Sequence, residues 1–243
     1  MAFSTELKEH REGKVIYLKD RQSDCIAEIY SLGALLNSFI VKAKNRYLNI
    51  IDGFESIKQA TLESTNGFKS AKLSPFVCRL HKGSFEFENK AYTIEKFYLG
   101  DEAIHGLIYD APFEIVRLSA DENAAEVTLL YLYNNKKQGF PFNYSMEVTY
   151  RLSGNCSLTL ITKVINEDNK NMPLCDGWHP YFKLNSKVDE LMVQFNSNAL
   201  LEFDNRLLPT GKSLPDNRFE KPVLLGNTFL DNSFIVKNFD EPA

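Results

Sequence analysis

Apolar and polar residues alternate along most of this chain. In the segment NYSMEVTYRLSGNCSLTLITKVIN the residues Tyr144, Met146 and Val148 are apolar and the residues between them are polar. This period of two is typical of a β-strand with one face buried and the other in water. A turn at Gly154 and Asn155 then leads into a second alternating run, so the segment predicts a β-hairpin.

Other segments repeat this pattern. SFEFENKAYTIE predicts a hairpin with a short turn, and APFEIVRLSADENAAEVTLLYLYN predicts one with a longer polar tip. Consecutive hairpins indicate antiparallel sheets, and many short strands separated by turns favour a sandwich or barrel over an α/β fold. FESIKQATLEST is the only stretch with much helical character. We therefore expect an all-β, antiparallel fold. Further strand candidates are KVIYLKD, CIAEIY, NSFIVKA, ELMVQFN, ALLEFD and NSFIV.

The length and the apolar content set the domain organisation. A chain of 243 residues, 44% of them hydrophobic, can build one large core, and single β domains reach this size. We expect one β-sandwich domain over residues 1–243. Its apolar stretches are too short to cross a bilayer, and the N-terminus has no signal-peptide pattern. We therefore expect no membrane partner and a cytoplasmic location.

Charge and cysteine usage exclude further classes of protein. The chain has 28 basic and 32 acidic residues, a net charge of −4, and no cluster of basic residues longer than a pair. Nucleic-acid binding needs such a basic surface, so we expect no nucleic-acid partner. Four cysteines are scattered singly without CxxC spacing, which favours reduced thiols over a disulfide framework. They are Cys25, Cys78, Cys156 and Cys175.

The chain has four histidines, and they lie in different sequence contexts. His10 lies in a charged segment and is expected at the surface, whereas His81 follows the strand-like Arg79. His105 precedes a glycine, which lets the backbone approach another group closely. His179 follows the only tryptophan, in LCDGWHPYFKLN. A lone histidine is more often structural than functional, so each of these also has a plain packing interpretation.

Metal and nucleophile chemistry have little support. The sequence contains no HxH, HExxH or Cys/His pair at ligand spacing, and no GxSxG. We expect no metal and no cofactor.

Aromatic residues surround His179. Trp178, Tyr181 and Phe182 flank it, and aromatic residues make up 12% of the chain. Core packing accounts for most aromatics in a β domain. The sharper interpretation is a platform for a sugar, because pyranose rings have an apolar face of C–H bonds and hydroxyls that need polar partners.

Five segments, in order, carry a resemblance to a known family. They are CRLHKGSFEFENKAYTI, EAIHGL, GFPFNYSMEVTYRL, NMPLCDGWHPYFKL and LLPTG. Together they resemble the aldose 1-epimerase (galactose mutarotase) family, in the divergent branch that includes glucose-6-phosphate 1-epimerase-like proteins. The resemblance covers roughly residues 75 to 236 and implies a galactose-mutarotase-like β-sandwich.

The resemblance also implies an activity and a site. In this family a carboxylate takes the proton from the anomeric hydroxyl, a histidine protonates the ring oxygen, and the opened sugar closes as the other anomer. By its match to the second histidine motif, His179 is the candidate general acid. His105 and Arg79 match positions that hold the sugar and support developing charge. We expect the three to share one groove with Trp178 or Tyr181 in its wall, and the substrate to be a hexose, free or phosphorylated.

Two parts of the family pattern differ here. The family's general base is a glutamate beyond the strand that LDNSFIVK resembles, and we expect this chain to lack those C-terminal strands. After the Pro-Thr-Gly turn, alignment on the proline places Arg218 where the family has a sugar-binding aspartate, so Asp216 is the nearest candidate. The leading hypothesis is an aldose 1-epimerase, and the alternative is a non-catalytic carbohydrate-binding protein on the same fold.

Overall fold

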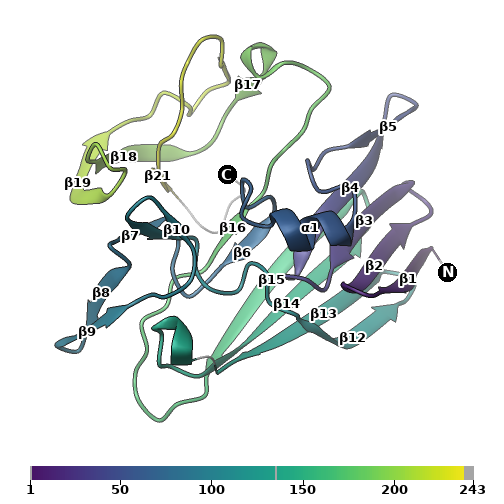
Figure 1. Ribbon diagram of the computed structural model, residues 1–243. Coiled ribbons are helices and arrows are strands. Elements are labelled where there is room, and N and C mark those ends of the chain that lie inside the picture. The colour runs from purple at the N-terminus through teal and green to yellow at the C-terminus, as the bar shows by residue number, and fades with distance from the viewer. Residues whose placement is uncertain (1, 135, 238–243) are drawn as a thin grey trace. The chain divides into compact units, whose positions relative to one another are not determined.

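The computed structural model describes residues 2–134 and 136–237, and its fold is all-β. Every strand pair in that part of the chain is antiparallel, which confirms the fold predicted from the alternation (Figure 1). The chain divides into two compact units, Met1–Lys183 and Leu184–Ala243. The single-domain organisation stays a prediction.

The first unit contains two large meandering sheets. Consecutive strands are neighbours in both, because each is joined to the next by a tight hairpin or a short connection. The first sheet has the order β1-β2-β3-β4-β5, with β1 (Phe3–His10), β2 (Gly13–Asp20), β3 (Cys25–Tyr30), β4 (Leu35–Ala43) and β5 (Arg46–Asn49). The second has the order β12-β13-β14-β15, with β12 (Glu114–Ala120), β13 (Ala124–Tyr133), β14 (Tyr144–Ser153) and β15 (Ser157–Asn166).

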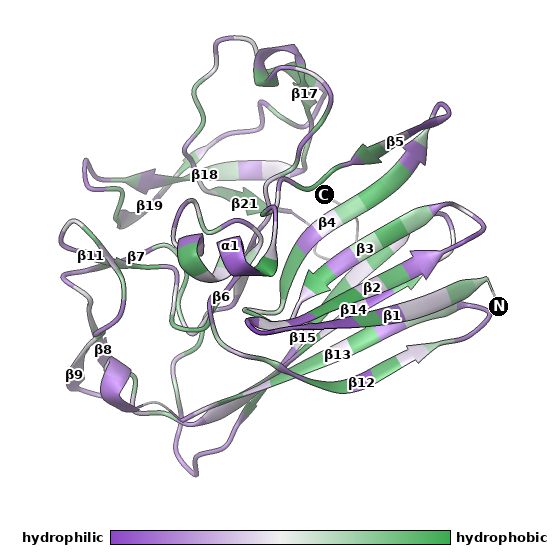
Figure 2. Cartoon of the chain, turned by 45° about the vertical axis from the view of Figure 1, so that its right-hand side comes forward, coloured by the Kyte–Doolittle hydropathy of each residue, from purple (hydrophilic) through white to green (hydrophobic). Residues whose placement is uncertain are grey.

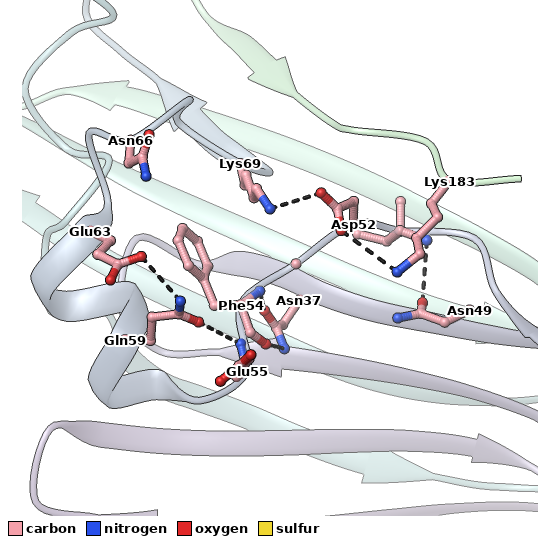
Figure 3. A pocket seen from close by; sticks show the side chains of 12 residues that line it. Asn37, Asn49, Asp52, Phe54, Glu55, Gln59, Glu63, Asn66, Lys69 and Lys183 are labelled. Carbon is pink, nitrogen blue, oxygen red and sulfur yellow. Dashed lines mark hydrogen bonds and ion pairs between the residues drawn. The ribbon is translucent and has the colours of Figure 1, made fainter. Parts of the chain in front are cut away.

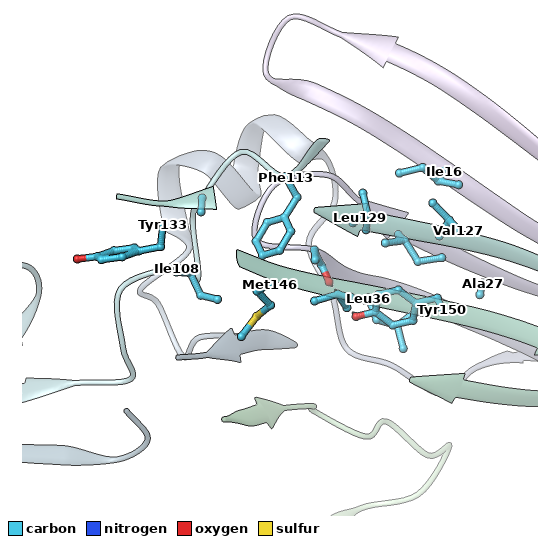
Figure 4. Close-up of a cluster of buried hydrophobic side chains, with 14 of the residues drawn as sticks. Ile16, Ala27, Leu36, Ile108, Phe113, Val127, Leu129, Tyr133, Met146 and Tyr150 are labelled. Carbon is cyan, nitrogen blue, oxygen red and sulfur yellow. Dashed lines mark hydrogen bonds between the residues drawn. The ribbon is translucent and has the colours of Figure 1, made fainter. Parts of the chain in front are cut away.

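The core lies where these two sheets face each other. Apolar residues alternate with polar ones along the long strands (Figure 2), and the inward rows of both sheets meet in one buried cluster (Figure 4). Ile16 and Ala27 come from the first sheet, and Val127 and Met146 from the second. The period-two pattern therefore places the core where the sequence predicts it.

A hydrogen bond and a disulfide link the two sheets. The hydroxyl of Tyr150, a fully buried side chain, donates a 2.8 Å hydrogen bond to the carbonyl oxygen of Ala34. Cys25, at the start of β3, forms a disulfide with Cys156, in the turn before β15. The expectation of reduced thiols is wrong for this pair, because the sandwich brings together two cysteines that sequence spacing keeps far apart; their Cα atoms are 5.7 Å apart, a usual disulfide distance.

Short ladders and one helix complete the first unit. The predicted helical stretch forms α1 (Ile57–Glu63), which begins after Ser56, whose side chain accepts a hydrogen bond from the backbone of Gln59. A short 3-10 helix follows β13 at η1 (Lys136–Gln138). The ladders are β6 (Ala71–Leu73) with β16 (Gly177–His179), β7 (Arg79–His81) with β11 (Glu102–Ile104) and β10 (Tyr98–Leu99), and β8 (Ser84–Phe87) with β9 (Lys90–Thr93).

The second unit is a small β structure around three phenylalanines. The rings of Phe195, Phe219 and Phe234 contact one another with centroids 4.8 to 5.6 Å apart. Its strands are β17 (Met192–Val193), β18 (Ser197–Phe203), β19 (Pro209–Pro215), β20 (Val223–Leu224) and β21 (Phe234–Val236), with the 3-10 helix η2 (Val188–Glu190). β18 lies between β19 and β21, and β17 pairs with β20.

Candidate functional site

His179 is held by a two-stranded ladder. It ends β16, where its register partner on β6 is Ala71. The His179 carbonyl oxygen also accepts a 2.8 Å hydrogen bond from the backbone of Ser70. The backbone of His179 is therefore held both by the ladder and by this bond. The motif that the sequence analysis singled out is therefore the end of a short strand, and its backbone is anchored to a segment about one hundred residues earlier.

His105 is presented by a strained turn directly after β11. Its φ of 63° lies in the left-handed region, which non-glycine residues seldom adopt. The backbone of His105 donates to the Cys78 carbonyl at 3.0 Å, and that of Leu107 donates to the Ser74 carbonyl at 2.7 Å. Between them, Gly106 lies so close to Ser74 that an added Cβ would be 2.4 Å from its carbonyl oxygen. The close approach predicted from this glycine is confirmed.

The two histidine rings meet. Their centroids are 5.0 Å apart, edge to face. Phe68 contacts the ring of His105 at 4.7 Å, and Tyr181 contacts the ring of His179 at 5.3 Å. The Nδ1 atoms of both histidines are buried, and neither has a hydrogen-bond partner within the described ranges. Buried polar atoms are normally paired, so an unpaired ring nitrogen on each of two touching histidines indicates groups kept for a ligand or a reaction.

Burial makes both rings poor proton acceptors. Together with the smaller effects of the charges of His179 and Arg79, it lowers the pKa of His105 from 6.5 to about 4. Burial also lowers the pKa of His179 below 6.5. Both imidazoles are therefore predominantly neutral near pH 7, and each protonated form is a stronger acid than free imidazole.

Arg79 adds a cation beside His105. On the β7–β11 ladder it is the register partner of Ile104, the residue before His105. Its guanidinium has no ion-pair partner in the part of the chain that the structure describes, although the side chain is half-buried. The proximity of Arg79, His105 and His179 that the sequence analysis expects is thus present in the geometry.

The aromatic residues around His179 lie on two different faces. Neighbouring residues of a strand point to opposite sides. Tyr181 lies on the side of His179, whereas Trp178 is the register partner of Lys72, packs against the main core and donates to the Ser70 carbonyl at 3.1 Å. The structure therefore brings Tyr181 to the histidines and assigns Trp178 to packing.

Phe68 is a site residue that the sequence analysis does not single out. It is buried, follows Gly67 with a φ of 53°, and packs against Tyr109 as well as His105. Its only sequence signal is the glycine before it, which marks an irregular turn but not a contact with a distant histidine.

Asp216 belongs to the second unit. Its carboxylate is 2.7 Å from the guanidinium of Arg218, and the hydrogen bond from Arg218 is the main cause that lowers its pKa. Arg218, which alignment on the proline places at the family's aspartate position, and Asp216 are thus ion-paired with each other.

Two further carboxylates stand three residues before the histidines in sequence, and both are engaged. Glu102 accepts hydrogen bonds from His81 Nδ1 and from the Lys82 backbone, each at 3.0 Å. Asp176 accepts a 2.7 Å hydrogen bond from the buried Lys72 ammonium group. Asp176 lies two residues before Trp178, the register partner of Lys72. Since Glu102 and Asp176 both have these partners, neither carboxylate is free to act at the histidine pair.

Other kinds of site find no support in the described residues. No three histidine, cysteine, aspartate or glutamate side chains there gather as a metal site needs. None of the helices in the described ranges has the length and apolar character needed to span a bilayer.

The family model for aldose 1-epimerase matches residues 14–243. The chain belongs to the aldose 1-epimerase family. The resemblance drawn from the five sequence segments is confirmed, and the match extends beyond them in both directions.

Two curated members of this family are similar to the chain. It is 29% identical over 226 residues to the bifunctional protein gal10 of Schizosaccharomyces pombe, covering 88% of this chain and 31% of that protein. It is 24% identical over 232 residues to an aldose 1-epimerase of Streptococcus thermophilus, covering 89% of this chain and 65% of that protein. The chain thus spans less than two thirds of the length of either relative.

Solved structures of the family share the fold. Galactose 1-epimerase from Lactobacillus acidophilus superposes with a TM-score of 0.81 at 20% identity, covering 99% of this chain and 75% of that one. A galactose mutarotase-like protein from Clostridium acetobutylicum gives a TM-score of 0.84 at 20% identity, covering 99% and 74%. At this identity the likeness supports the galactose-mutarotase-like sandwich and leaves the chemistry to the site.

Proposed function

We propose that this chain carries the acid–base site of a mutarotase, which interconverts the α and β anomers of an aldose. The observation that carries the proposal is the pair of buried histidine rings with unpaired Nδ1 atoms and an arginine beside them. The names of its relatives include an aldose 1-epimerase and a galactose 1-epimerase, which supports a hexose as substrate. Whether that hexose is free or phosphorylated is part of the proposal's test.

The proposed reaction needs one proton donor and one acceptor. A base takes the proton of the anomeric hydroxyl, while His179 gives a proton to the ring oxygen as the bond between that oxygen and the anomeric carbon breaks. The carbonyl group of the open aldehyde turns, and the same steps in reverse close the ring on its other face. Arg79 and His105 hold hydroxyls and stabilise negative charge that develops on oxygen. Desolvation, which lowers the pKa of His179, also makes its protonated form a readier donor.

One observation supports a second candidate function, sugar binding without catalysis. Glu102 and Asp176 are both held by basic or backbone partners, so neither is placed as the general base. A groove with a proton donor and hydroxyl-binding groups but no base would bind sugars without accelerating their mutarotation. The alternative is therefore a carbohydrate-binding protein of this fold.

Polarimetry on freshly dissolved α-galactose and α-glucose tests the proposal. The wild-type chain should accelerate the change in rotation, and His179→Asn should reduce turnover by about 10²–10⁴-fold with little change in sugar affinity. His105→Asn should cause a smaller loss of rate together with weaker sugar binding.

His10→Asn is the matched control, because His10 is exposed on β1, and it should behave as wild type. Full turnover in the His179 variant would contradict the proposal. Sugar binding without any acceleration by the wild-type chain would favour the alternative.

A further inference from the structure

A pocket of the first unit is lined by none of the histidine-site residues. It has a volume of about 410 Å³ and is lined by Asn37 of β4, the end of β5 and the segment after it, α1 and the residues just before β6 (Figure 3). Most of its lining side chains are polar. The ones that matter below are Asn49, Asp52, Glu55, Asn66, Lys69 and Lys183.

The positive charges in this pocket are already paired. Lys69 donates a 2.7 Å hydrogen bond to Asp52, and the ammonium group of Lys183 is 3.8 Å from the other oxygen of the same carboxylate. The bond from Lys69 is the main cause that lowers the pKa of Asp52, which therefore stays ionised at neutral pH. Since Glu55 and Glu63 also line the pocket, carboxylates outnumber ammonium groups. A phosphate would meet no unpaired cation here.

Hydrogen-bonding groups outside these ion pairs, in contrast, are available. The side-chain amide of Asn66, the amide nitrogen of Asn49 and the carboxylate of Glu55 have no side-chain hydrogen-bond partner within the described ranges. They offer both donors and acceptors. Hydroxyl groups need partners of both kinds, because each can donate one hydrogen bond and accept two.

Tyr181 links this pocket to the histidines. Its ring contacts His179, and its hydroxyl lies over Gly67, the neighbour of Asn66. The Tyr181 carbonyl oxygen accepts a 2.8 Å hydrogen bond from the backbone of Asp52. Lys183, two residues further, then lines the pocket. One extended segment thus carries His179, Tyr181 and Lys183 from the first site to the second.

We propose that this pocket is a second carbohydrate site, which binds one uncharged pyranose ring. Its volume accommodates a hexose with ordered water, its free groups are the donors and acceptors that hydroxyls use, and its excess of carboxylates disfavours phosphorylated sugars. The ring comes either from a separate monosaccharide or from a disaccharide whose other ring lies at the histidines. The proposal is independent of the mutarotase activity.

An NMR titration of the isotope-labelled chain tests this site directly. Methyl β-galactoside is the first probe, because it has no free anomeric hydroxyl and cannot mutarotate. It should shift the side-chain amide signals of Asn49 and Asn66. The double variant Glu55→Ala/Asn66→Ala should weaken its binding by about tenfold, as expected for the loss of one or two hydrogen bonds. Asn123→Ala, at the exposed tip of the β12–β13 hairpin, is the matched control and should bind as wild type.

Two further probes identify the source and the charge of the ligand. Lactose that binds at least tenfold more tightly than methyl β-galactoside indicates a ring delivered by a bridging disaccharide, and equal affinities indicate a separate monosaccharide. Galactose 6-phosphate should bind more weakly than either.

The proposal is overturned if neutral sugars leave both amide signals unchanged, or if galactose 6-phosphate shifts them at the lowest concentration. Mutarotation of galactose by the double variant should equal that of wild type. If the wild-type chain does not accelerate mutarotation but neutral sugars still shift the amide signals, only the proposed mutarotase function is contradicted.

Discussion

The rings of His105 and His179 meet edge to face with their centroids 5.0 Å apart, and both have a pKa lowered by burial. Each ring is therefore kept neutral in the folded state at a pH where the unfolded chain would already take up a proton. Stability must then depend on pH in a defined window.

Thermal unfolding should reveal this window. Above pH 6.5 His105 is neutral in both states, and as the pH falls from 6.5 towards 4 the unfolded chain binds a proton that folded His105 does not. Stability is thus present above the unfolded pKa and is lost as the pH falls towards the folded one. The melting temperature should decrease over this range, and His105→Asn should flatten the decrease. An unchanged pH dependence in the variant would contradict the assignment of the lowered pKa.

The aromatic residues around His179 should separate into two functions. Tyr181→Ala should weaken sugar binding while changing the melting temperature little, because the ring contacts His179 and is partly exposed. Trp178→Ala should reduce stability by about 2–3 kcal/mol, somewhat less than a fully buried tryptophan, because its ring packs against the core. Calorimetry and sugar titration on both variants measure the two effects. A tryptophan variant with normal stability and lost affinity would reverse the assignment.

The disulfide between Cys25 and Cys156 should be a major source of stability. It joins the two sheets across a sequence separation of 131 residues. Cys25→Ser/Cys156→Ser should lose about 2–5 kcal/mol in urea unfolding, as is usual when a native disulfide is removed. Cys175→Ser is the control, since Cys175 is exposed and unpaired. Equal stability of the double variant and wild type under oxidising conditions would show that the bond does not form in solution.

Removing one partner of the Lys72–Asp176 ion pair should lower the stability of the chain more than replacing both partners with apolar residues. Lys72 is almost fully buried and also donates to Thr162 on β15, whereas Asp176 keeps some contact with water. Lys72→Met leaves the carboxylate without its partner and should destabilise the chain by about 1–3 kcal/mol. Lys72→Met/Asp176→Leu should recover most of this loss, as measured in a double-mutant cycle. A double variant less stable than the single one would mean that the ion pair itself is strongly stabilising.

Sequence patterning predicts the long hairpins well because each has one face buried and one face in water. The segment from Tyr144 to Asn166 forms two ten-residue strands with the predicted turn between them. The N-terminal strand β1 is not predicted, because FSTELKEH is charged and half of it is exposed at the edge of its sheet. There the pairing with β2 determines the strand, and pairing leaves no local signal.

The candidate site can be predicted only in part from the sequence, for a similar reason. Its histidines can be singled out from their neighbours, but the faces of Trp178 and Asp176 depend on the register between β6 and β16. The same holds for Lys72, which is buried although its strand carries no recognisable motif. Contacts between segments distant in the chain decide which polar groups are already in use.

The left-handed backbone at His105 limits which residues can occupy position 105. At a φ of 63°, asparagine and glycine are tolerated, whereas β-branched residues are strained whatever their side-chain chemistry. A saturation library at this position would therefore be sorted by conformation first and by sugar chemistry second. New specificities at position 105 are accessible mainly through residues that accept the turn, and wider variation needs a compensating change at Gly106 or in the Ser74 segment against which it packs.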